Sequence, residues 1–83
     1  MPFKSQVELV DWLADLLNTR IPDATNKRRL RSRLFEARKR GDIPDRLTKK
    51  GELRLDVQAV HLWAAKQGDL RDLIKAHFPD RYR

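Results

Sequence analysis

The chain lacks the features that would cross-link it covalently, bind a metal through thiolates or anchor it in a membrane. It has no cysteine among its 83 residues, which excludes disulfides and cysteine-based zinc sites. Its longest apolar runs are only a few residues, so we expect no membrane span and no signal peptide, and a cytoplasmic location is the default interpretation. The length predicts a single domain over residues 1–83, with no room for a separate catalytic domain.

Motifs typical of enzymes are also missing. No glycine-rich phosphate loop, nucleophile motif or cofactor fingerprint is present. His61 and His77 have no carboxylate at metal-ligand spacing on the same helical face, so neither a zinc site nor a histidine base is predicted. Asp11 and Asp15 are spaced i, i+4, but no third ligand completes a metal site. We therefore expect no enzymatic activity, cofactor, metal or small-molecule ligand.

Positive charge is abundant and concentrated in the middle of the chain. Nineteen Lys and Arg residues against twelve Asp and Glu give a formal net charge of +7. Residues 25–55 hold twelve basic and four acidic side chains, a net of +8, whereas residues 1–24 carry −2 and residues 56–83 carry +1. A localised excess of this kind is typical of a surface that follows a phosphate backbone.

Capping residues and hydrophobic periodicity predict a mainly α fold. Ser5 followed by Glu8 reads as a capping box, Gly41 as a C-terminal cap, and Asp56 and Asp69 as N-terminal caps. A change to alternating periodicity around the turn Lys49-Lys50-Gly51 predicts one small β-hairpin. The expected elements are a helix over 5–18, a helix over 25–40, a hairpin over 46–55, a helix over 56–67 and a helix over 69–78.

The helix expected over residues 25–40 has a narrow apolar seam of Leu30, Leu34 and Ala37. Its other sides carry eight Lys and Arg residues, with Glu36 as the only acid. Like charges at this density destabilise an isolated helix, and a counter-charged partner would relieve the repulsion. The order of helix, turn, basic helix and basic hairpin is that of a winged helix-turn-helix domain.

Two runs in the chain also resemble a known family. They resemble the wing region of MerR-like proteins and of the related phage excisionases and small terminase subunits. The residues that carry the resemblance are Gly41-Asp42-Ile43-Pro44-Asp45-Arg46, Gly51-Glu52-Leu53-Arg54-Leu55-Asp56-Val57 and Trp63. The resemblance covers roughly residues 7–67. It implies a winged helix-turn-helix that binds a DNA site, as an excisionase-like factor, a small transcriptional regulator or a packaging factor of phage or mobile-element type.

The chain departs from this family in three respects. Leu53 stands where such regulators often carry an aromatic wing residue, and the turn over residues 18–24 is longer than a tight helix-turn-helix requires. The long dimerising helix and the ligand-binding region of full-length MerR regulators are absent. Metal or drug sensing is therefore not implied.

A recognition helix in the major groove brings the residues in its N-terminal half nearest the base edges. We expect base contacts from Asn26, Arg28 and Arg31. The side chains expected to hold phosphates are Thr25, Lys27, Arg29, Ser32 and Lys39. The wing residues expected on the backbone or minor groove are Lys49, Lys50 and Arg54.

Other interpretations remain open from the sequence. Arginine-rich helices also bind RNA, as in ribosome-associated proteins. A protein-interaction module could use the acidic first helix or the apolar last helix, and the last helix could instead close a homodimer. Phe35 is expected to pack under the wing or another helix rather than to stack on a base, and Trp12 and Trp63 are expected in the core rather than as ligand platforms. The target sequence, oligomeric state, DNA bending and biological role are not predicted.

Overall fold

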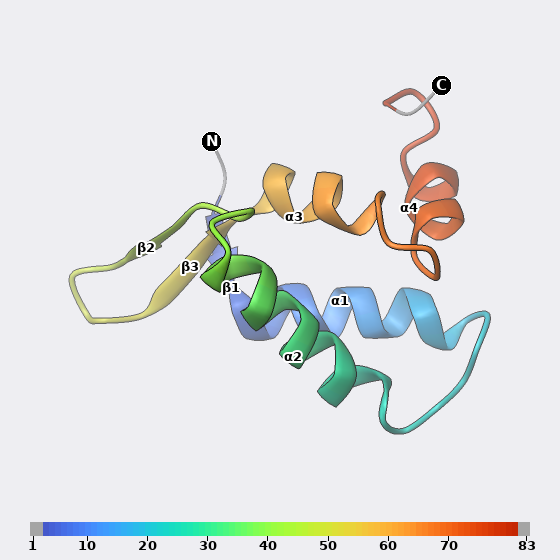
Figure 1. Cartoon of the computed structure of the whole chain (residues 1–83), viewed down its shortest axis with the longest axis horizontal. Helices are drawn as coiled ribbons and strands as arrows, with labels where there is room; N and C mark the ends of the chain where they lie inside the picture. The colour runs from blue at the N-terminus through green and yellow to red at the C-terminus, as the bar shows by residue number, and fades with distance from the viewer. Residues whose placement is uncertain (1–2, 82–83) are drawn as a thin grey trace.

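The computed structural model describes residues 3–81. The ends of the expected 1–83 domain, Met1, Pro2, Tyr82 and Arg83, lie outside the described residues. Seven elements follow one another along the chain: β1 (Phe3–Ser5), α1 (Gln6–Asn18), α2 (Asn26–Lys39), β2 (Asp45–Leu47), β3 (Leu53–Asp56), α3 (Val57–Ala64) and α4 (Arg71–His77). The prediction of a mainly α fold with a small β-hairpin is confirmed. The helix α2 crosses α1, and the β2–β3 hairpin extends beyond the C-terminal end of α2 (Figure 1).

The local signals at three helix ends act as predicted. Ser5 accepts a hydrogen bond from the backbone amide of Glu8 at 3.2 Å and so caps α1. Asp56 caps α3 in the same way, accepting from the amide of Ala59 at 3.1 Å. Gly41 follows α2 with φ of +85°, and its amide donates to the carbonyl of Arg38. Each cap satisfies backbone groups that the helix itself leaves without partners.

The sheet has three antiparallel strands rather than the two of the expected hairpin. Its strand order is β1-β3-β2, because Phe3–Ser5 pairs with Leu53–Asp56 along the other edge of the central strand. This N-terminal strand was not predicted. A two-stranded hairpin alone is marginally stable in water, and the third strand supplies part of the support that it requires.

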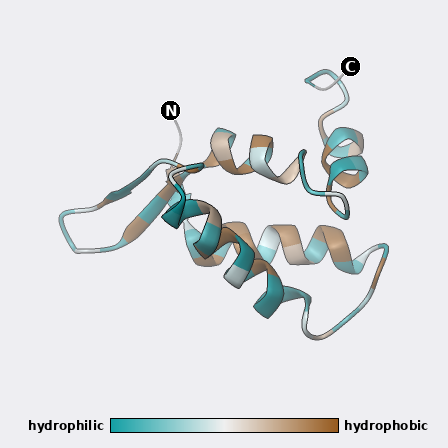
Figure 2. Cartoon of the chain, in the orientation of Figure 1, coloured by the Kyte–Doolittle hydropathy of each residue, from teal (hydrophilic) through white to brown (hydrophobic). Residues whose placement is uncertain are grey.

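The hydrophobic core is formed by all four helices and the central strand. Leu13 of α1, Leu30 and Leu34 of α2, Leu55 of β3 and Val60 of α3 are fully buried. Hydrophilic residues predominate along α2 and around the hairpin loop, whereas α1 carries longer hydrophobic stretches (Figure 2). The seam predicted for α2 therefore faces the core and leaves the charged sides of that helix outward. The expected core position of Trp63 is confirmed, since only 7% of this residue is exposed.

The C-terminal elements differ from the prediction at their boundaries. The helix expected over 56–67 ends at Ala64, and residues 65–70 form turns in which the amide of Lys66 donates to the carbonyl of Trp63. The last helix begins at Arg71 and has no side-chain cap. The prediction that Asp69 caps it is wrong, because both carboxylate oxygens of Asp69 accept hydrogen bonds from Arg33.

The apolar residues of α4 are used within the chain. Leu70, which precedes the helix, and Ile74 within it are fully buried, and Leu73 and Phe78 pack against the same core. The homodimer that the sequence left open would use this apolar side. Leu70 and Ile74 are unavailable to a partner because they fill the core, and Leu73 and Phe78 are partly buried.

Candidate nucleic-acid interface

The outward side of α2 presents a line of side chains to solvent. Residues at spacings of 0, 4, 7 and 11 lie on one face of a helix. In α2 these positions opposite the buried seam are Arg28, Ser32, Phe35 and Lys39, and all four are exposed. We call them the outer stripe. Arg31 is exposed beside it, so the two arginines expected to contact bases both lie on the surface.

The basic side chains of α2 differ in whether a carboxylate already neutralises them. Lys27 Nζ lies 2.6 Å from Asp11 Oδ1, and Arg29 lies 3.9 Å from Asp23. Within the part of the chain that the structure describes, no acidic group lies within ion-pair distance of Arg28 or Arg31. These two guanidinium groups therefore keep their full hydrogen-bonding capacity for an external acceptor.

The pairs made by Lys27 and Arg29 do not exclude the phosphate contacts expected of these residues. The side chains of Lys27 and Asp11 are about half exposed, at 52% and 46%. Ion pairs at such sites contribute only about 0 to 1 kcal/mol, so a phosphate oxygen could replace the carboxylate at small cost. Arg29 is more exposed still, at 66%, and its separation from Asp23 is long.

Two other arginines of α2 have structural contacts. Arg33 donates to both oxygens of Asp69 at 2.8 and 2.9 Å and lies over the ring of Trp63, which fastens α2 to the segment between α3 and α4. This hydrogen-bonded arginine lowers the pKa of the Asp69 carboxyl group. Arg38 donates to Gln6 at 3.2 Å and pairs with Asp45 at 3.5 Å. Arg38 thereby connects the C-terminal end of α2 to the first strand of the hairpin.

The structure corrects the role expected of Asn26. Only 4% of this residue is exposed. Its amide nitrogen donates to Asn18 Oδ1 and to the carbonyl of Ile21, both at 2.8 Å. The prediction that Asn26 reads adenine is wrong, because its amide is buried in the connection between α1 and α2. The same bonds explain how a turn longer than that of a tight helix-turn-helix remains ordered.

Thr25 also has a local role rather than the expected phosphate contact. Its hydroxyl donates to Asp23 Oδ1 at 2.7 Å, and its backbone amide donates to the same oxygen at 2.8 Å. These two bonds, led by the backbone one, lower the pKa of Asp23. The hydroxyl of Thr25 therefore donates its proton within the turn just before α2, and it is not free to donate to a phosphate.

The hairpin places two further cations at its tip. Lys49 and Lys50 are exposed in the turn that follows Thr48, where the amide of Gly51 donates to the carbonyl of Thr48 at 2.9 Å. Gly51 adopts a φ of +79°, a left-handed conformation that a side chain would disfavour. The predicted tip is therefore confirmed, with both lysines directed to solvent and unpaired among the ion pairs of residues 3–81.

Arg54 is less available than the lysines of the tip. Its guanidinium donates to Glu52 at 3.2 Å and its side chain is 40% exposed. Directly opposite in the register is Arg46, whose guanidinium lies 4.2 Å from the ring centroid of Phe3. Sequence reasoning missed Arg46 as a neighbour of Arg54. A predicted pairing register for the hairpin would have placed Arg46 opposite Arg54.

Phe35 is exposed, contrary to the expectation that it packs under the wing or another helix. It is 41% exposed, and the cationic groups of Arg38 and Lys39 lie 5.2 and 5.4 Å from its ring centroid. The aromatic ring thus belongs to the outer stripe, among the positive charges.

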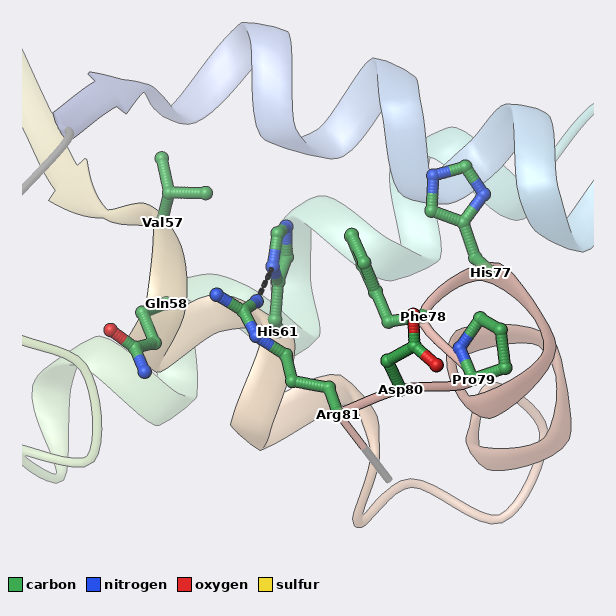
Figure 3. Close-up of a pocket in the computed structure, with 8 residues that line it drawn as sticks. All are labelled: Val57, Gln58, His61, His77, Phe78, Pro79, Asp80 and Arg81. Atoms are coloured by element: carbon green, nitrogen blue, oxygen red, sulfur yellow. Dashed lines mark hydrogen bonds between the residues drawn. The ribbon is translucent and has the colours of Figure 1, made fainter. Parts of the chain in front are cut away.

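One hollow of the described surface lies away from α2. It encloses about 600 Å³ between the start of α3 and the residues that follow α4, and His61, His77 and Phe78 line it (Figure 3). None of the residues expected to contact nucleic acid lines this hollow. The outer stripe is an exposed helix face, and two smaller hollows lie beside it, one lined by Ser32 and Arg40 and the other by Lys27 and Arg31.

The ring of Trp12 packs against His61, His77 and Phe78, with centroid separations of 4.9 to 6.0 Å. Trp12 is partly buried and packs against the core. Burial lowers the pKa of His61, and the neighbouring Arg81, whose Nη1 lies 3.3 Å from His61 Nδ1, lowers it further. This aromatic cluster joins α1 to α3 and to the C-terminal end of α4.

Residues 3–81 contain no group of three or more His, Cys, Asp or Glu side chains arranged to hold a metal ion. None of the helices described is both long enough and apolar enough to cross a bilayer.

Comparison with known proteins gives no relative: no family model, no curated protein and no solved structure matches this chain.

Proposed function

We propose that this protein binds duplex DNA in a sequence-specific manner as a winged helix-turn-helix, with α2 in the major groove and the β2–β3 hairpin as the wing. It would act as an excisionase-like factor or a small transcriptional regulator. The observation that carries the proposal is the state of Arg28 and Arg31, which are exposed on α2 with no carboxylate in ion-pair distance among the described residues.

These arginines suit the reading of guanine. A guanidinium can donate two hydrogen bonds to O6 and N7 of one guanine, which discriminates against the wrong base by about 1 to 3 kcal/mol. Both residues lie in the N-terminal half of α2, the part of a recognition helix that supplies many of its base contacts. Arg33 and Arg38 are excluded from this role because their contacts hold α2 in place.

Phosphate contacts would fix the register of α2 in the groove. Ser32 and Lys39 lie on the outer stripe, and Lys27 and Arg29 flank it. Lys49 and Lys50 would meet the backbone or minor groove from the wing, which the Arg38–Asp45 ion pair ties to the C-terminal end of α2. Two separate cationic elements fixed relative to each other favour a duplex over a flexible single strand.

The decisive experiment is an in vitro selection from random duplexes at about physiological salt, where non-specific binding is already weakened. We expect one sequence motif that contains guanine to be enriched. Arg28→Ala and Arg31→Ala should each weaken binding of that motif by about 5- to 150-fold and relax selectivity at one base pair. Lys49→Ala should weaken all duplexes alike and reduce the salt slope by about one unit.

Lys75→Ala is the matched control, because it removes one exposed positive charge from α4. It should leave the affinity within a factor of about two, since this charge lies outside the proposed interface and is screened at physiological salt. Failure to enrich any motif would refute sequence-specific binding. Stronger binding of a structured RNA than of the selected duplex would favour the RNA alternative.

A further inference from the structure

We infer that Phe35 is a specificity-determining residue that contacts the 5-methyl group of a thymine in the bound duplex. This inference rests on the proposed function and deepens it, since it names a second base that the outer stripe would read. It follows from the position of one aromatic ring within a surface that is otherwise polar and positively charged.

The exposure of Phe35 is unusual for its helix. Five large hydrophobic residues among positions 3–81 are exposed, and Phe35 is the one of them that lies in α2. Arg28 and Ser32 precede it on the outer stripe and Lys39 follows it. The outer stripe therefore presents one aromatic ring among polar and positively charged side chains.

The ring is also held in place. The charged groups of Arg38 and Lys39 lie 5.2 and 5.4 Å from the centroid of Phe35, within the range of cation–π attraction. Arg38 is itself fixed by Gln6 and Asp45. Phe35 therefore lies against the fixed guanidinium of Arg38, and about two-fifths of its surface remains exposed to a ligand.

The chemistry of the major groove selects the contact. A phenyl ring cannot donate to or accept from base edges, and the one apolar group displayed in the major groove is the thymine 5-methyl. An apolar protein surface is a poorer partner, because docking it over Phe35 would also desolvate the surrounding cations. The ligand that satisfies both the charges and the ring is a duplex with a thymine at the matching step.

The geometry predicts where this thymine lies. Phe35 follows Arg28 by seven residues, or roughly 10 Å along the helix axis at 1.5 Å per residue. At 3.4 Å per base pair this length corresponds to at most about three steps along the duplex, because a helix that follows the inclined groove advances less along the duplex axis. The selected motif should therefore contain a thymine within about three base pairs of the guanine whose recognition depends on Arg28.

The test uses the selected duplex with each thymine replaced singly by deoxyuridine, which removes only the methyl group. Binding by the intact protein should weaken about four-fold at one position, the effect of withdrawing one methyl group from apolar contact. In Phe35→Ala the same replacement should have no effect, and the affinity for the unmodified duplex should be reduced. Phe35→Ala should fold normally, as circular dichroism would verify, because the side chain is on the surface.

Leu62→Ala is the matched control, since Leu62 is a similarly exposed hydrophobic residue, at 48%, but lies in α3. It should keep the sensitivity to deoxyuridine. Suppose that a motif is enriched and its binding depends on Arg28. The inference then fails, while the proposed function stands, if no deoxyuridine weakens binding or if the sensitivity to deoxyuridine persists in Phe35→Ala. If Phe35→Ala instead abolishes a preference for the single strand over the duplex, the ring stacks on unpaired bases and the inference is overturned. If no motif is enriched, both fail.

Discussion

Substituting Asn26 by alanine distinguishes a structural role for this residue from the base contact that the sequence predicts. The side chain is buried at the start of α2, and its amide nitrogen makes two hydrogen bonds of 2.8 Å, to Asn18 and to the carbonyl of Ile21. Both acceptors belong to the end of α1 and the turn after it. The substitution therefore removes the link that orders the connection between the two helices.

The expected loss follows from these two bonds. Each hydrogen bond contributes about 0.5 to 1.5 kcal/mol net, and an acceptor left buried without a partner costs about 1 to 3 kcal/mol. Asn18 and Ile21 are both exposed, so their oxygens can recover hydrogen bonds to water and this penalty does not apply. Alanine returns up to about 0.7 kcal/mol of helix propensity. The free energy of unfolding of Asn26→Ala should therefore fall by about 0.5 to 2 kcal/mol.

Urea denaturation of the wild type and the variant measures this loss, and an unchanged m-value would show that both unfold to the same extent. Ser32→Ala, on the outer stripe of the same helix, is the control and should stay within about 0.5 kcal/mol of the wild type. The folded fraction of Asn26→Ala should select the same DNA motif as the wild type. A loss below about 0.5 kcal/mol together with relaxed selectivity at an adenine would refute the structural assignment and restore the base contact.

Three further substitutions test other parts of the structure. A double-mutant cycle of Arg33→Ala and Asp69→Ala, measured by urea denaturation, should give a coupling free energy of about 1 kcal/mol, since this bidentate ion pair is one-third exposed and partly screened by solvent. Additive effects of the two substitutions would contradict this coupling. The pKa of His61 lies below its usual value of 6.5, so at pH values between the two the unfolded chain binds more protons than the folded one. The melting temperature should therefore fall as pH decreases through 6.5, and the contribution of His61 should level off below its folded-state pKa; His61→Gln should flatten this part of the pH dependence. A rise in melting temperature on acidification that depends on His61 would invert this reasoning. Gly41→Ala should lower the free energy of unfolding by about 1 kcal/mol, because Gly41 has a φ of +85° that alanine disfavours. Gly68→Ala should cause no such loss, because Gly68 has no positive φ and a Cβ there would meet open space. Equal losses of stability for the two variants in thermal denaturation would contradict this difference.

The features that the sequence predicted correctly are local ones. The capping of α1 by Ser5, the left-handed Gly41 and the turn at Gly51 depend on residues within a few positions of each other. The seam of α2 follows from helical periodicity alone, because Leu30 and Leu34 are one turn apart. The concentration of positive charge in residues 25–55 is likewise a property of the composition.

The features that sequence reasoning missed depend on contacts between distant residues. The strand β1 is three residues long and carries no periodic signal, so only its pairing with β3 defines it. Asp69 has the residue type and position of a helix cap, but Arg33, 36 residues away in the chain, takes its carboxylate. The apolar side of α4 reads as free in the sequence and is buried in the tertiary structure.

The helix of residues 25–40 illustrates both kinds of information. The sequence by itself determined that this helix forms, where its apolar seam runs and that it carries most of the positive charge, because periodicity and composition are fixed along the chain. Only the tertiary structure decided which of its cations are free. Arg33 and Arg38 are committed to partners from other elements, whereas Arg28 and Arg31 face solvent without a carboxylate nearby among the described residues, because ion pairing depends on distances in space that the sequence does not specify.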